Sequence, residues 1–157
     1  MALEEQILAD MKTALLNPAG GDRFNGDILR DLKAAILNEK VADGTRNETM
    51  SDESVEKIVA REVKKRRESI KLYEENGRQE LAENEKREIS VLEKYLPKMM
   101  DESEVSTLID DIIKNIDGVS MQKMGQVIGA VKAKAGNTAD GALVAKLVKE
   151  KLQQSNN

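Results

Sequence analysis

The chain has 157 residues and a formal net charge of −4, with 34% charged but only 2% aromatic residues. This length predicts one or two domains. The sequence contains no Cys and no His, which excludes disulfides, zinc sites built from those ligands and catalysis by Cys–His or Ser–His pairs. Acid–base chemistry would therefore depend on Asp, Glu, Lys or Tyr.

The composition favours an all-α fold, because Ala, Leu, Glu and Lys are good helix formers and the aromatic residues typical of sheets are scarce. The first residues, "MALEEQILADMKTALL", include acids and lack a long apolar core. They resemble neither a signal peptide nor a membrane span, so we expect a cytoplasmic protein without a membrane partner.

Two helices are predicted in the first part of the chain. Leu3, Ile7 and Met11 follow helical spacing, and this helix should end at Asn17, because the residue before Pro18 avoids helix. Residues 19–26, "AGGDRFNG", are predicted to form a loop. A second helix is expected from about Asp27 to a second loop over residues 42–50.

Two longer helices should follow and pair as an antiparallel hairpin. Ser51 precedes two acids and is predicted to cap the third helix, which should end at Asn76-Gly77. A fourth helix returns after this short turn and breaks at Pro97. The basic segment "REVKKRRESIK" on the third helix is expected to pair first with acids of the hairpin.

Beyond Pro97 the pattern predicts three short amphipathic helices. Asp101 and Glu104 form a D-x-x-E capping signal for the first of them, and Ser120 and Thr138 are candidate caps for the other two. We therefore predict two domains, with N-terminal helices and a hairpin over residues 1–97 and a three-helix unit over residues 98–157.

The stretch "KMGQVIGAVKAKAGNTADG", residues 123–141, holds four glycines. No strand precedes it and no Lys-Ser or Lys-Thr follows the glycines, so a phosphate-binding loop is disfavoured. Gly125 and Gly129 lie one helical turn apart, and we predict that they let a neighbouring helix approach closely. Gly136 and Asn137 suit a left-handed helix end.

Two segments carry a resemblance to a known family. "REVKKRRESIKLYEENGRQELAENEKREISVLEKYLP" (residues 61–97) and "MGQVIGAVKAKAGNTADGALVAKLVKEKL" (residues 124–152) resemble the hairpin and C-terminal module of the GatB/YqeY family. The length and helix order are similar to those of stand-alone YqeY-like proteins. One departure is Asn137-Thr138, which stands where family members commonly have a basic residue before Ala-Asp-Gly.

The resemblance implies contact with a folded tRNA. In GatB this module is the tail of a glutamine-dependent tRNA amidotransferase and contacts the tRNA body. Residues 121–157 hold six lysines against two acids, whereas residues 101–120 hold one lysine against six acids. The candidate nucleic-acid-binding residues are therefore Lys123, Lys132, Lys134, Lys146, Lys149 and Lys151. The alternative interpretation is a set of solvated lysines that complement helix C-termini.

Three functions remain open from the sequence. The first is a non-catalytic tRNA-interacting module without cofactor or metal, with amidotransferase or tRNA synthetase components as further possible partners. The family also implies carbon–nitrogen ligase activity with glutamine as amide donor. The chain has no nucleotide-binding loop and no Ser-Ser-Lys amidase signature, which favours an accessory role in that reaction. The third function is a protein–protein adaptor that binds through its hairpin.

Overall fold

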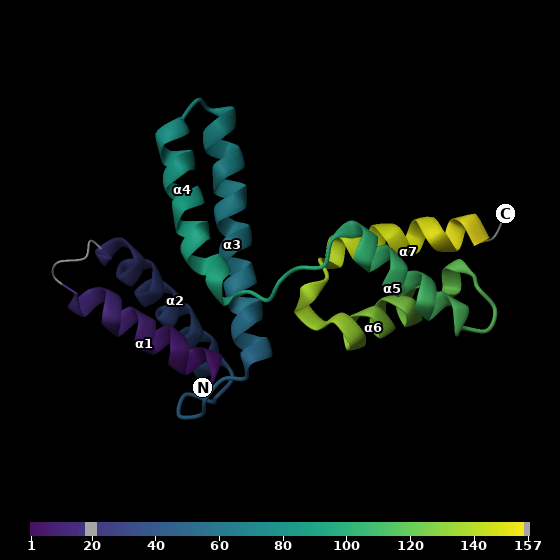
Figure 1. The fold of residues 1–157 in the computed structure, drawn as a ribbon, viewed down its shortest axis with the longest axis horizontal. Coiled ribbons are helices and arrows are strands. Elements are labelled where there is room, and N and C mark those ends of the chain that lie inside the picture. The colour runs from purple at the N-terminus through teal and green to yellow at the C-terminus, as the bar shows by residue number, and fades with distance from the viewer. Residues whose placement is uncertain (18–21, 156–157) are drawn as a thin grey trace. The chain divides into compact units, whose positions relative to one another are not determined.

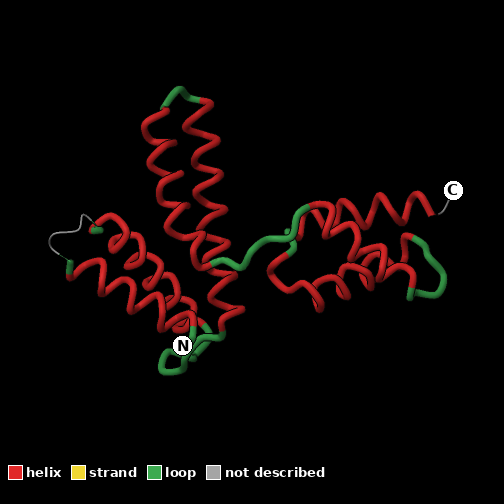
Figure 2. The backbone as a smooth tube through the Cα atoms, in the orientation of Figure 1, coloured by secondary structure: helices red, strands yellow, loops and turns green. Residues whose placement is uncertain are grey.

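The computed structural model describes residues 1–17 and 22–155. Every regular element in these residues is a helix, as Figure 2 shows, which confirms the all-α prediction. The chain divides into two compact units, Met1–Leu96 and Pro97–Asn157. That residues 1–97 and 98–157 form two domains stays a prediction.

Unit 1 consists of two pairs of helices. The first pair is α1 (Leu3–Leu16) and α2 (Arg23–Ala42), and the second is α3 (Asp52–Glu75) and α4 (Gln79–Leu92), which is extended by the short 3-10 helix η1 (Glu93–Tyr95). Figure 1 shows α3 and α4 side by side, joined by a tight turn. Gly77 adopts a φ of 70° in that turn, a conformation that suits glycine. One apolar core joins both pairs, and it includes Ile7, Leu32, Val55, Val59 and Leu92.

Local signals explain where α3 begins. The Ser54 backbone N–H donates to the Ser51 side-chain oxygen at 3.3 Å, so Ser51 caps this helix as predicted. Asp52 and Glu53 lie in its first turn, where negative charge complements the helix dipole. The predicted pairing within the hairpin is found for Arg66, which lies within 3.1 Å of Glu62 and 3.7 Å of Glu88.

The predicted loop over residues 19–26 is partly wrong. Residues 19–21 lie outside the described residues, but α2 already begins at Arg23 rather than near Asp27. Gly26 is buried in its first turns, and a Cβ atom there would lie 2.6 Å from Leu15 Cδ2. Its missing side chain therefore makes room for Leu15 of α1. This contact between helices is not visible in the local sequence pattern.

Unit 2 contains three helices: α5 (Glu102–Lys114), α6 (Met124–Ala135) and α7 (Gly141–Ser155). The short 3-10 helices η2 (Met121–Lys123) and η3 (Gly136–Thr138) flank α6. A separate apolar core joins the three helices, and it includes Val105, Ile109, Val131, Val148 and Leu152. The predicted capping box is present, with Glu104 N–H donating to Asp101 at 2.8 Å and Asp101 N–H to Glu104 at 3.1 Å.

The two other predicted caps of unit 2 are wrong. Ser120 precedes η2, but its side chain makes no capping hydrogen bond. The Thr138 hydroxyl donates to the carbonyl of Ala135, three residues earlier, at 2.6 Å. Its hydrogen bond is therefore made to the last residue of α6 and not to the start of α7. The final helix begins at Gly141, and the first helical bond of α7 runs from Val144 N–H to the Asp140 carbonyl.

Candidate nucleic-acid interface

Four of the six candidate lysines are exposed and form no ion pair in the described part of the chain: Lys132, Lys134, Lys146 and Lys149. Lys132 and Lys134 lie in the last turn of α6, where positive charge complements the helix dipole. Lys146 and Lys149 lie on α7. These four side chains are available to anionic groups from outside the chain.

Lys146 and Lys149 form the best-defined pair. Residues three apart lie on the same side of a helix. The opposite side of α7 is buried in the core of unit 2 through Val144, Leu147, Val148 and Leu152. The two ammonium groups therefore project from one solvent-facing side of α7.

Lys132 and Lys134 do not share a face of α6. Residues two apart on an α-helix are separated by about 200° around its axis. Lys132 is instead seven residues after Gly125 and three after Gly129, so these three residues lie along one side of the helix. In the sequence these lysines form one basic cluster. In the helix, Lys132 and Lys134 lie on different sides of α6.

Lys151 and Lys123 are less available than the other four. Lys151 Nζ lies 2.7 Å from Asp110 Oδ1, and its side chain is 21% exposed. This ion pair connects α7 to α5, so the charge of Lys151 is already balanced within unit 2. Lys123 ends η2, directly before α6, and is half-buried.

The glycines of α6 do not serve helix packing, and our packing prediction is wrong. A Cβ atom built on Gly125 or Gly129 would meet no atom within 4 Å, and both residues are exposed. The neighbouring helices pack instead against the side of α6 that carries Val127 and Val131. The prediction for the following turn is confirmed in part, because Gly136 has a φ of 56°, whereas Asn137 has no positive φ.

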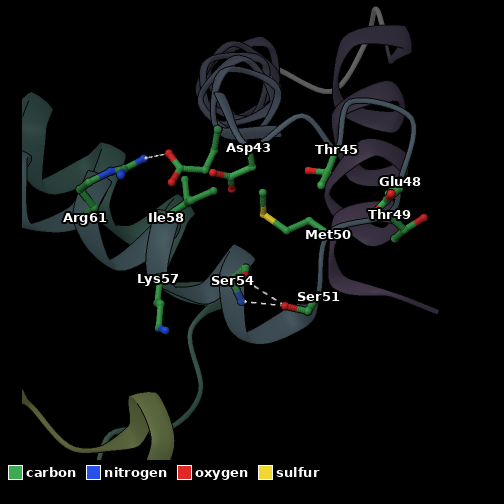
Figure 3. A pocket seen from close by; sticks show the side chains of 11 residues that line it. Asp43, Thr45, Glu48, Thr49, Met50, Ser51, Ser54, Lys57, Ile58 and Arg61 are labelled. Carbon is green, nitrogen blue, oxygen red and sulfur yellow. Dashed lines mark hydrogen bonds and ion pairs between the residues drawn. The ribbon is translucent and has the colours of Figure 1, made fainter. Parts of the chain in front are cut away.

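Unit 1 also contains a polar cleft of about 420 Å³, which the sequence pattern does not predict. It lies where the end of α2, the following loop and the start of α3 meet, and Figure 3 shows its side chains. Acids, hydroxyls and two basic residues line it around an apolar floor: Glu39, Asp43, Thr45, Glu48, Thr49, Met50, Ser51, Ser54, Lys57, Ile58 and Arg61.

The polar groups of this cleft are largely engaged by the fold itself. Arg61 pairs with Glu39 at 3.4 Å, as the dashed line in Figure 3 marks. The Ser51 hydroxyl donates to the Ser54 hydroxyl at 2.9 Å, and Lys57 pairs with Glu53 at 3.6 Å. The first contact joins α3 to α2 and the other two lie within the start of α3, so we assign the cleft a structural role.

Two groups of unit 1 that are at least partly buried, Tyr95 and Glu88, have raised pKa values. Burial, together with the hydrogen bond that its hydroxyl donates to Asp10 at 2.6 Å, raises the pKa of Tyr95 above its ordinary value. Burial and the nearby Glu85 carboxylate raise the pKa of Glu88, although Arg66 opposes this shift. Within the described residues no three Asp or Glu side chains are grouped to hold a metal ion.

A match to a known family spans nearly the whole chain. A family model described as "Yqey-like protein" matches residues 4–152. The chain belongs to the YqeY-like protein family. The match includes α1 and α2 and runs through both units, beyond the two segments that carried the resemblance in the sequence. No curated protein matches the chain.

Membership of the YqeY-like family relates this chain to a known class of module. The family is related to the C-terminal region of GatB, so the chain fits an amidotransferase-related module. In the described part of this YqeY-like chain, no helix is long and apolar enough to cross a membrane.

Proposed function

We propose that this YqeY-like chain is a non-catalytic module that binds the folded body of a tRNA in the cytoplasm, with unit 2 supplying the contacts. The observation that carries the proposal is the set of exposed lysines without ion pairs on α6 and α7, in a family related to the GatB tail. Such lysines attract phosphate oxygens. When a lysine neutralises a phosphate, counterions that were condensed on the nucleic acid are released.

The open side of α6 also supports this proposal. Gly125 and Gly129 expose backbone there, and Lys132 lies on the same side. A glycine allows a ligand backbone to approach closely, so a sugar–phosphate chain could lie against α6 while Lys132 binds a phosphate. Only three aromatic residues occur in the whole sequence, which favours recognition of shape and phosphates over stacking on single-stranded bases.

The test compares two variants with equal loss of charge. Lys146→Gln with Lys149→Gln changes one side of α7. Lys64→Gln with Lys71→Gln changes two exposed lysines of α3 that also lack ion pairs. Binding of a tRNA transcript is measured by fluorescence anisotropy at several salt concentrations. The α7 variant should bind tRNA roughly tenfold more weakly. The slope of its log affinity against log salt concentration should be shallower by about one to two, because fewer counterions are released.

Two results would overturn this proposal. The first is a parent protein that fails to bind tRNA at low salt, and the second is an equal loss of affinity in the α7 and α3 variants. The non-catalytic role has a separate assay. The purified chain should not amidate Glu-tRNA with glutamine, and amidation coupled to glutamate release without another subunit would contradict that role.

A further inference from the structure

Several exposed apolar side chains of unit 1 lie on α1 and α2. Leu15 is 40% exposed, Leu37 is 39% exposed and Val41 is 56% exposed. Leu8 is half-buried and lies seven residues before Leu15, so the two share one side of α1. Leu37 and Val41 are four residues apart and lie on neighbouring positions of α2.

These two helices enclose a shallow groove of about 200 Å³. Ile7 and Ile36 are buried and form its floor, while Leu8 and Leu37 line its sides. Lys33 lies at its edge, and the ion pair between Glu4 and Lys40 closes one end. The volume is below the roughly 300–1,000 Å³ typical of small-molecule sites, so it suits individual side chains of a larger partner.

The groove opens on the side of the α1–α2 pair that faces away from the hairpin. Asp10 of α1 contacts Tyr95 of η1, and Leu8 lies two residues away, about 200° around the helix. On α2, Phe24 contacts Arg87 of α4, and Lys33 lies nine residues later, about 180° around the helix. Both helices therefore bury their other sides within unit 1 and leave this one uncovered.

The charges along this side are positive. Lys12 on α1 and Lys33 on α2 are exposed and form no ion pair in residues 1–17 and 22–155. Of the neighbouring acids, Asp27 is balanced by Arg30 at 3.1 Å, whereas Glu5 accepts a hydrogen bond from the neutral Ala2 backbone N–H at 3.2 Å, which does not offset its charge. Two lysines without ion pairs against this one acid leave a net positive charge on this side. A partner that covers the groove would bring the balancing negative charge.

We propose that the α1–α2 groove binds one amphipathic helix of a partner protein, with leucine-type anchors and with Asp or Glu on its flanks. A third helix laid along an antiparallel pair buries its apolar side in the groove, with anchors at i, i+4 and i+7. Carboxylates on either flank then reach Lys12 and Lys33. This inference is independent of the tRNA proposal, because it uses other residues and another unit.

The probe is a synthetic amphipathic helix of about 18 residues with leucine anchors and glutamate flanks. A matched peptide carries lysine in place of every glutamate. Binding is measured by anisotropy on the full chain. The glutamate peptide should bind at least tenfold more tightly than the lysine peptide, and added salt should reduce this preference. The double variant Lys12→Glu with Lys33→Glu should reverse the preference.

A pair of leucine variants tests the groove itself. Leu37→Gln should weaken binding of the glutamate peptide about tenfold or more. Leu72→Gln is the matched control, since Leu72 is 60% exposed on the hairpin and should leave binding unchanged. Circular dichroism melting verifies that each variant is folded. If Leu37→Gln unfolds, the charge-reversal variant decides, because Lys12 and Lys33 are exposed.

Each of four results would overturn the proposal. They are binding of neither peptide to the parent, equal binding of both, no change of preference on charge reversal, and equal effects of Leu37→Gln and Leu72→Gln. Light scattering adds a fifth. If the parent is a dimer that Leu37→Gln separates, a second copy of the chain occupies the groove instead of a partner helix.

Discussion

Lys40 Nζ on α2 lies 2.7 Å from Glu4 Oε1 on α1, and the two side chains are only 11% and 12% exposed. The other oxygen of Glu4 accepts a hydrogen bond from the Met50 backbone N–H at 2.6 Å. One carboxylate therefore connects α1, α2 and the residue that leads into α3. Lys40 is also the one charged residue that is buried among the described residues.

This buried pair should be costly to break from one side. Lys40→Met leaves the partly buried Glu4 carboxylate with the Met50 N–H as its remaining partner, and we expect unit 1 to lose about 3 kcal/mol. Urea unfolding followed by circular dichroism measures the loss. Adding Glu4→Gln to Lys40→Met should restore part of it, because no unpaired charge is then buried. If Lys40→Met alone were as stable as the parent, this account would be contradicted.

The hydrogen bond from Tyr95 to Asp10 should make stability depend on alkaline pH. The raised pKa of Tyr95 means that the unfolded chain loses this proton near pH 10, while the folded chain keeps it to a higher pH. Its contribution is therefore fully present below about pH 10 and is lost as the pH rises further. Tyr95→Phe should remove this component and cost roughly 1–3 kcal/mol at neutral pH.

The check for Tyr95 is a series of urea unfolding curves between neutral pH and pH 11. The free energies of unfolding of the parent and of Tyr95→Phe should converge above pH 10. Parallel profiles would show that Tyr95 keeps no proton in the folded state that the unfolded chain loses.

Glu88 should destabilise the hairpin while it is charged. Burial and the neighbouring Glu85 raise its pKa, so the folded chain holds this proton more strongly than the unfolded chain does. Glu88→Gln should therefore raise the melting temperature at pH 7. The advantage should disappear as the pH falls below the ordinary glutamate value of 4.5, because the parent is then protonated in both states.

A melting temperature that falls on Glu88→Gln at pH 7 would show that attraction between Glu88 and Arg66 outweighs burial. Glu83→Gln is the control, because Glu83 is an exposed acid of the same helix and should show no comparable pH-dependent gain.

The exposed glycines of α6 should tolerate side chains. Since a Cβ atom at Gly129 would meet no neighbour within 4 Å, Gly129→Ala should stabilise unit 2 by about 0.4–1 kcal/mol through helix propensity. Gly136→Ala is the contrasting variant, because its φ of 56° disfavours any side chain, and it should cost about 1–2 kcal/mol. Thermal melting measures both changes, and a Gly129→Ala variant less stable than the parent would contradict the expected gain from helix propensity.

The sequence alone predicted the helices and several of their ends, because those features depend on residues close together in the chain. Apolar spacing marks a helix within a few turns, and the caps at Ser51 and Asp101 act across three residues. The family resemblance was likewise readable from continuous segments, and the family match extended it to residues 4–152.

Only the tertiary structure decided which residues of the candidate sites are available. Lys151 is engaged by Asp110, 41 residues away in the chain. At position 26 of α2 a side chain would collide with Leu15 of another helix, so the glycine there serves helix packing. Gly125 and Gly129 looked like packing glycines, yet the neighbouring helices pack on another side of α6. Sequence spacing defines the sides of one helix, whereas the packing between helices determines which side is buried and which remains open to a partner.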